Sequence, residues 1–179
     1  VEAKYVVNAA GVEADKVHAM VGGHTFKTLP NRGEYFLLDK AQGELVNKVV
    51  FQCPNPDGKG VLVAPTVHGN LIVGPNAEGV DRAEDVNNTA AGLAFVRKMS
   101  VKSVPDVNFR DSIRNFAGVR ANSDQADFII EESPAAKGFI NLGGIKSPGL
   151  SSAPAIGVEA VELLQSCGLA LHKKETFID

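Results

Sequence analysis

The sequence predicts an α+β fold in which α/β pieces at both ends flank a mainly antiparallel sheet. Three observations lead to this prediction. Residues 1–24 show a strand pattern followed by a helical one, and residues 138–179 show a strand, a glycine-rich loop and a helix. Between them, residues 25–137 contain short apolar runs separated by turn signals, with one helical stretch. We therefore expect two lobes, with the terminal pieces in one layer and the middle as an inserted sheet.

Composition excludes several classes of protein. The chain has 179 residues, of which 44% are hydrophobic and 22% charged, as in soluble globular domains. A formal net charge of −3 without a basic run argues against nucleic acid as a partner. The apolar runs are too short to span a membrane, and no leader sequence is seen, so we expect a cytoplasmic protein. Cys53 and Cys167 form no CxxC motif and are expected to be reduced thiols.

The stretch from Gly138 to Gly157 has the most specific local pattern. An apolar run of strand length ends at the pair Gly143-Gly144, and a helical pattern follows. Ser151 and Ser152 are expected to cap this helix, with Pro154 in its first turn. Unpaired N–H groups and the helix dipole favour an anion or an electron-rich carbonyl at such a loop. An ordinary strand-loop-helix turn would give the same pattern.

Three cations near predicted loops are candidates for binding an anion. Arg120 follows an alternating strand, where it can clamp a carboxylate or phosphate, or pair with Asp124 or Asp127. Arg32 precedes a glycine and either covers a ligand or caps a turn. Lys146 is the only charge in the glycine-rich loop. The histidines lack metal-ligand spacing, no GxGxxG or Walker motif occurs, and no catalytic residue is assigned.

Five short segments occur in a definite order along the chain. They are Asn8–Gly11 after a Val-Val strand, Pro30–Tyr35, Ala64–Pro65 with Gly69–Asn70 and Gly74–Pro75, Ala117–Arg120, and Gly144–Leu150. In order and spacing they resemble the C-terminal part of the FAD-dependent oxidoreductases related to D-amino-acid oxidase. The branch of glycerol-3-phosphate dehydrogenase and L-2-hydroxyglutarate oxidase is the most similar. The resemblance runs from about Ala3 to about Leu164.

The resemblance implies residues that bind FAD and residues that bind substrate. The implied cofactor-binding residues are Asn8, Ala9, Ala10, Gly11, Gly143, Gly144, Ile145, Lys146, Ser147, Pro148, Gly149 and Leu150. The second group would pass by the flavin ring, and the next helix would point its N-terminus at the ring's N1/C2 carbonyl region. Arg120 would bind the anionic group of the substrate, with Lys146 and Arg32 as further candidates. Lys146 stands where hydroxyglutarate-type loops often carry glutamate, which leaves the substrate open.

The implied reaction is hydride transfer from a small anionic hydroxy compound, of the glycerol 3-phosphate or 2-hydroxyglutarate type, to flavin N5. One alternative is an amine or amino-acid oxidase of the same family. Another is an α+β module that binds an anionic ligand without redox chemistry.

The resemblance also implies a domain division. Residues 1–24 and 138–179 would be pieces of an FAD-binding domain, and residues 25–137 would form the substrate-binding domain. The family's phosphate-cradling glycine loop is not in this sequence, which opens directly on a strand. We therefore expect a fragment whose partner is a missing N-terminal FAD-binding segment of the same chain. Alone, it should bind FAD weakly or not at all and be inactive.

Overall fold

The computed structural model has the predicted α+β fold. It describes residues 2–53, 60–172, 174 and 176. Helices are few among these residues, and most strand pairs are antiparallel.

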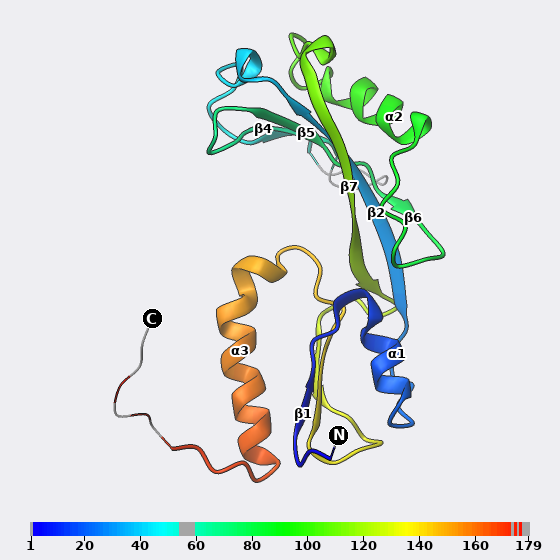
Figure 1. Ribbon diagram of the computed structural model, residues 1–179, viewed down its shortest axis with the longest axis vertical. Coiled ribbons are helices and arrows are strands. Elements are labelled where there is room, and N and C mark those ends of the chain that lie inside the picture. The colour runs from blue at the N-terminus through cyan, green and yellow to red at the C-terminus, as the bar shows by residue number, and fades with distance from the viewer. Residues whose placement is uncertain (1, 54–59, 173, 175, 177–179) are drawn as a thin grey trace. The chain divides into compact units, whose positions relative to one another are not determined.

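The chain forms two compact units, coloured by residue number in Figure 1. The first unit contains residues 1–29 and 121–179, and the second contains residues 30–120. The sequence pattern instead suggested boundaries after residues 24 and 137. The second boundary differs because the strand near Ile130 pairs with the strand that starts at Phe139, a long-range contact that periodicity does not reveal. Assigning the units to cofactor and substrate domains stays a prediction.

The first unit is a small sheet between two helices. Its elements are β1 (Val6–Asn8), η1 (Gly11–Glu13), α1 (Ala14–Ala19), β8 (Ile129–Glu132), β9 (Phe139–Gly143) and α3 (Gly149–Ser166). The strand order is β1-β9-β8, with β1 parallel and β8 antiparallel to β9. α1 and α3 lie on opposite sides of this sheet (Figure 1). β1 is an edge strand among the described residues, and its Val6 and Val7 are 38% and 43% exposed.

A buried histidine lies in the core of the first unit. His18 on α1 is fully buried, stacks on Phe26 and Phe139, and shares a hydrogen bond of 2.7 Å between its Nε2 and Ser133 Oγ. Gly23 packs against the ring so closely that a Cβ there would lie within bonding distance of it. Burial lowers the pKa of His18 from its ordinary value, because a charged imidazole would lose its hydration.

The second unit is a larger sheet with one helix. Its elements are β2 (Thr28–Leu38), η2 (Lys40–Gln42), β3 (Val50–Phe51), β4 (Leu62–Pro65), β5 (Leu71–Gly74), β6 (Glu78–Gly79), α2 (Ala90–Ser100), η3 (Phe109–Asp111) and β7 (Ser112–Ser123); the ends of β2 and β7 belong to the first unit. The strand order is β3-β4-β5-β2-β6, and β7 also pairs with β2. The apolar runs Val61–Val63 and Leu71–Val73 on either side of His68–Asn70 predict a β-hairpin, and the antiparallel pairing of β4 with β5 confirms it.

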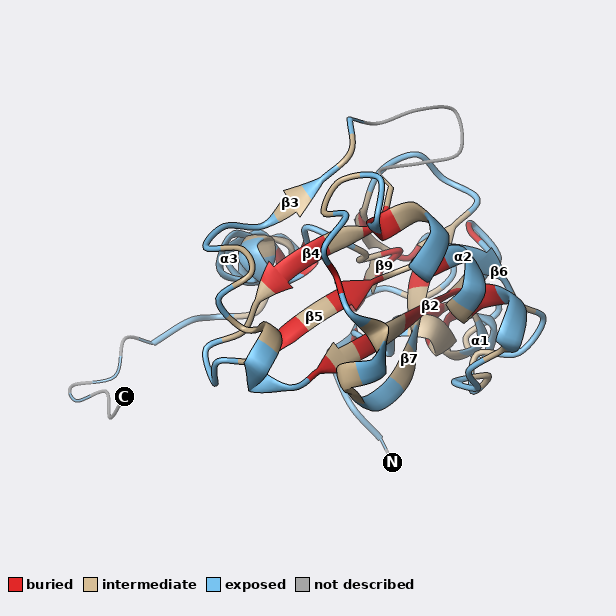
Figure 2. Cartoon of the chain, turned by 90° about the horizontal axis from the view of Figure 1, so that it is seen from above, coloured by how far each residue is buried: buried red, intermediate tan, exposed pale blue. Residues whose placement is uncertain are grey.

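The core of the second unit is formed by alternate residues of the central strands. β2, β4 and β5 contribute Phe36, Leu38, Val63, Leu71 and Val73. Figure 2 shows the buried positions along β4 and β5 in red. α2 covers one face of this sheet and adds Val96 to the same core. Along β2 from Phe36 to Leu38 and along β5 from Leu71 to Val73, buried residues alternate with half-buried ones, as in a sheet with one covered face.

Two predicted strands differ from the structure. The pattern of residues 46–53 predicts a strand, but within this segment only Val50–Phe51 pairs. The alternation of apolar and polar residues from Val107 to Phe116 predicts a strand that begins at Val107, whereas β7 begins at Ser112. It begins later because the Asn108 side chain accepts a hydrogen bond from the backbone N–H of Arg110 and closes a 3-10 turn. The sequence Pro-Asn-Pro-Asp-Gly at residues 54–58 predicts a turn, but these positions lie outside the described residues.

Two helix starts also differ. The sequence predicts a helix with Asp85 near its N-cap, but α2 is capped by Thr89, whose hydroxyl accepts from the Gly92 N–H. α3 begins at Gly149 after a cis Ser147-Pro148 bond and has no side-chain cap. Ser151 is therefore no cap, since its hydroxyl donates back to the carbonyl of Pro148.

The buried His18 predicts a pH dependence of stability. The unfolded chain takes up a proton on His18 near the ordinary pKa of 6.5, whereas the folded chain does so only at lower pH. Stability should therefore fall as the pH drops below about 6.5 toward the folded-state pKa. In thermal unfolding between about pH 7.5 and about pH 5.5, His18→Gln should flatten the decrease in Tm. His68→Gln, at an exposed position, is the matched control. An equal slope in His18→Gln and the unmodified protein would contradict this.

Candidate functional site

The two predicted cofactor segments follow neighbouring strands of the first unit. β1 and β9 are parallel, with Asn8 opposite Asn141, so the segments that follow the two strands leave the sheet at the same end. Residues 8–11 continue from β1, and residues 143–150 continue from β9 into α3. Ligands of open α/β sheets bind outside the carboxyl ends of such strands.

The loop from Gly143 to Leu150 is shaped by backbone contacts. The N–H of Gly149 donates to the carbonyl of Lys146 (2.7 Å), and Gly144 has φ +64°, which favours glycine. A Cβ at Gly149 would lie 2.5 Å from Ile145 Cγ2. The first turn of α3 has neither a side-chain cap nor an acidic residue, and Leu150 in it is almost fully exposed. These features fit a bound electron-rich ring or anion at the helix N-terminus.

The segment after β1 is held by Asn8. This buried side chain donates from Nδ2 to the carbonyl of Ala14 (2.8 Å) and to Asn141 Oδ1 (2.9 Å). The next residues, Ala9 and Ala10, are exposed, and Gly11 has φ +60°. Asn8 thus fixes the turn from β1 into α1 and leaves a small, exposed backbone stretch.

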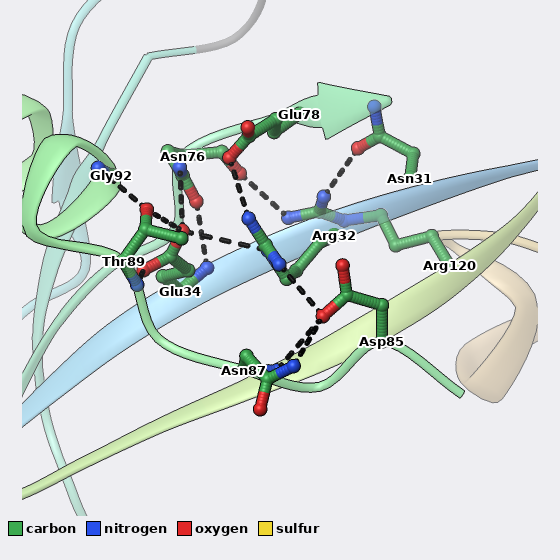
Figure 3. A network of polar contacts seen from close by, with 10 residues as sticks. All are labelled: Asn31, Arg32, Glu34, Asn76, Glu78, Asp85, Asn87, Thr89, Gly92 and Arg120. Carbon is green, nitrogen blue, oxygen red and sulfur yellow. Dashed lines mark hydrogen bonds and ion pairs between the residues drawn. The ribbon is translucent and has the colours of Figure 1, made fainter. Parts of the chain in front are cut away.

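Arg32 lies in β2, with a side chain that is only 4% exposed, and not in the expected turn. Its guanidinium faces three carboxylates: Glu78 Oε2 at 2.9 Å, Asp85 Oδ1 at 2.9 Å and Glu34 Oε1 at 3.5 Å (Figure 3). The hydrogen bond to Glu78 and the three negative charges raise the pKa of Arg32. The positive charge of Arg32 is therefore neutralised within the chain.

Glu34 is the centre of this network. Its carboxylate is fully buried and accepts from the Thr89 N–H (2.7 Å) and the Thr89 hydroxyl (2.9 Å), at the start of α2. Its own backbone N–H donates to Asn76 Oδ1 (2.7 Å). A Cβ at Gly92 would lie 2.1 Å from Glu34 Oε1, so the helix approaches the carboxylate as closely as glycine permits. Figure 3 shows these side chains converging from β2, α2 and the segment after β5.

Arg120 lies within β7 and has different partners. Its Nη1 donates to Asn31 Oδ1 (2.7 Å) and its Nη2 to the backbone carbonyl of Asn76 (3.2 Å). Over the ranges that the structure describes, no carboxylate lies within 4.0 Å of its guanidinium, so neither Asp124 nor Asp127 pairs with it. Arg120 is thus held by neutral acceptors and keeps its net charge.

The structure brings some predicted residues together. Arg32 and Arg120 meet one network in the second unit, while Lys146, half-buried, belongs to the loop of the first unit. Sequence reasoning missed Asn31, Glu34, Asn76 and Thr89. A glutamate within an apolar strand pattern was an available signal, because a buried carboxylate needs partners. The two asparagines gave none, since their partners are distant in sequence.

A groove outside these sites runs beside α2. It has a volume of about 550 Å³ and is lined by one face of α2 together with Phe36 and Asn115. It contains no predicted site residue.

Cys53 and Cys167 are free, as expected. Within the described part of the chain, no cluster of side chains suits a metal ion, and no helix is long and apolar enough to cross a membrane.

The chain combines a two-unit α+β fold with a glycine-rich loop before a helix and an arginine held by neutral acceptors. The chain belongs to the family of FAD-dependent oxidoreductases described as "DAO: FAD dependent oxidoreductase", which matches residues 1–163. The resemblance noted in the sequence is thereby confirmed.

Individual members of the family are similar to this chain over most of its length. A glycerol 3-phosphate dehydrogenase from Caloramator mitchellensis is 50% identical over 98% of this chain and 37% of its own length. The mitochondrial L-2-hydroxyglutarate dehydrogenase of Arabidopsis thaliana is 30% identical over 84% of this chain and 35% of its own. The dithionite-reduced L-alpha-glycerophosphate oxidase of Mycoplasma pneumoniae, solved with FAD bound, superposes with a TM-score of 0.88 at 38% identity. The match covers 97% of the present chain and 45% of the oxidase chain. The chain thus spans less than half the length of these relatives.

The network predicts the stability of a Glu34 variant. Glu34→Ala removes a buried carboxylate and leaves Thr89 and Arg32 short of partners, which should cost about 3 kcal/mol. For a chain of this size that corresponds to a fall in Tm on the order of 10 °C. Glu78→Ala is the control, because Glu78 pairs with the same arginine but is 48% exposed, and it should cost about 1 kcal/mol or less. Equal Tm values for the two variants would count against the role given to Glu34.

Proposed function

We propose that the full-length protein is an FAD-dependent dehydrogenase or oxidase for a small anionic hydroxy compound. Glycerol 3-phosphate is the first candidate and 2-hydroxyglutarate the second. The names of the relatives support this order, since the more similar one is a glycerol 3-phosphate dehydrogenase.

One observation carries the substrate class. Among the described residues, Arg120 has no carboxylate within 4.0 Å and has N–H groups beyond the two that it uses, whereas Arg32 is neutralised by three carboxylates. A guanidinium with free N–H groups binds phosphate or carboxylate bidentately. Arg120 is therefore the proposed binder of the anionic group. Lys146, in the loop of the first unit, stays a separate candidate for binding an anion. Arg32 should attract an anion less strongly than Arg120, because its charge is already paired with carboxylates.

The proposed cofactor-binding residues are those that follow the carboxyl ends of β1 and β9, namely residues 8–11 and 143–150. Bound FAD would supply the acceptor for the hydride that leaves the substrate carbon. Residues 143–150 would line the ring with backbone and leave the uncapped α3 terminus facing it. Asn8 would hold residues 9–11 in place beside them. These residues orient and stabilise, and no side chain is assigned to proton transfer.

The alternatives receive less support. The solved glycine oxidases of Geobacillus kaustophilus and Bacillus cereus share the fold at 21% and 17% identity, which is evidence of fold alone. Membership of a redox family counts against a module without redox chemistry. The expectation that the present residues bind FAD weakly or not at all on their own stays a prediction.

Purification of the full-length protein tests the cofactor and the substrate together. It should carry the visible absorption of bound flavin, and anaerobic addition of glycerol 3-phosphate should bleach it, since the ring takes up the hydride. 2-Hydroxyglutarate and glycine are the comparison compounds. Bleaching by glycine alone would contradict the proposed substrate class, and a colourless protein that does not take up FAD would contradict the cofactor.

Arg120→Ala tests the binding of the anionic group. Loss of a bidentate charged contact of about 3 kcal/mol should raise KM for glycerol 3-phosphate about 100-fold. Arg82→Ala is the matched control, because Arg82 is exposed and pairs with its neighbour Glu84. Steady-state kinetics of the full-length protein gives both values. An unchanged KM in Arg120→Ala would remove this residue from the substrate site.

A further inference from the structure

We propose that Asn31 is a positioning residue for Arg120, and that its neutral amide keeps this arginine available to an anion. This inference rests on the proposed function of Arg120 as the binder of the anionic group. It concerns only residues of the second unit and the contacts among them.

Two acceptors from different segments set the plane of the guanidinium. Asn31 Oδ1, on β2, accepts from Nη1 at 2.7 Å, and the backbone carbonyl of Asn76, after β5, accepts from Nη2 at 3.2 Å. Since each binds a different nitrogen, together they fix both the position and the rotation of the fork. The remaining N–H groups then have a defined direction, and a preorganised donor set loses less entropy when a ligand binds.

The strand also provides room for Arg120. A Cβ on Gly33 would lie 2.4 Å from Arg120 Nη2 and 2.8 Å from Pro75 Cβ. The side chain of any other residue at this position would therefore displace the guanidinium from its two acceptors. Asn31 and Gly33 are two residues apart in β2, so they share one face of the strand.

The opposite face of β2 serves the other arginine. Arg32 and Glu34 alternate with Asn31 and Gly33, and they carry the buried ion pairs. The alternation of side chains along β2 thus gives the two arginines different partners: carboxylates for Arg32, and an amide and a backbone carbonyl for Arg120. A carboxylate at position 31 would remove this distinction, because it would neutralise Arg120 directly.

The second acceptor is itself fixed by the buried network. The side chain of Asn76 accepts from the Glu34 N–H at 2.7 Å, and its Nδ2 lies 3.5 Å from Glu34 Oε1. Glu34 is in turn bound by Thr89 at the start of α2. The residue whose carbonyl faces Arg120 is therefore held mainly by the backbone N–H of Glu34.

The test compares Asn31→Asp, Asn31→Ala and Arg120→Ala in the full-length protein, with Asn88→Ala as an exposed control. Inorganic phosphate is titrated calorimetrically as the probe of the anion site, and kcat/KM is measured for glycerol 3-phosphate and for neutral glycerol. Asn31→Asp should raise the Kd for phosphate at least about tenfold, because its carboxylate pairs with Arg120 and competes with the ligand. Its Tm should equal or exceed that of the unmodified protein, since an ion pair replaces a neutral contact.

Asn31→Ala should raise the Kd about fivefold, because only positioning is lost. In both variants the ratio of kcat/KM for glycerol 3-phosphate to that for glycerol should fall, whereas a purely structural role would lower both rates and keep the ratio. If Arg120→Ala weakens phosphate but neither Asn31 variant does, the role of Asn31 is refuted and the proposed function stands. If Arg120→Ala leaves phosphate binding unchanged, the proposed anion site itself is wrong.

Discussion

The second unit depends on one buried carboxylate. Glu34 joins three segments that are far apart in sequence: its own strand β2, the segment around Asn76 and the first turn of α2 at Thr89. A carboxylate beside the N-terminus of a helix is favoured by the dipole and by the free N–H groups. Burial makes its hydrogen bonds stronger and the absence of any of them costly. The carboxylate of Glu34 contacts Arg32, and its backbone N–H holds Asn76, whose carbonyl accepts from Arg120.

The two arginines illustrate how one residue type serves two purposes. A buried guanidinium without counter-charges would be very unfavourable, so Arg32 is surrounded by carboxylates and acts as part of the framework. Arg120 is less buried and is held by an amide and a carbonyl, which orient it without neutralising it. Neutral acceptors can thus fix the position of a guanidinium without pairing its positive charge. An arginine that binds an anion needs both a fixed position and an unpaired charge.

Local patterns in the sequence predicted what depends on local physics. The hairpin of β4 and β5, the strand β9 and the helix after the glycine-rich loop follow from alternation, turn residues and helical periodicity, and the order of short segments indicated the family. What depends on distant partners was not predictable. Arg32 was interpreted as a turn residue because two of its three carboxylates, those of Glu78 and Asp85, are distant in sequence. Asp85 was interpreted as a helix cap because its pairing with Arg32 is not visible in the sequence. Likewise, nothing near Asn31 in the chain indicates Arg120.

The edge strand β1 has a practical consequence. Its two valines are about two-fifths exposed, and its outer backbone groups have no neighbouring strand within the described residues. Such an edge is a template on which another polypeptide can add a strand. A preparation of these residues alone should therefore tend toward self-association, and a covering strand or a charged substitution at Val7 would oppose it.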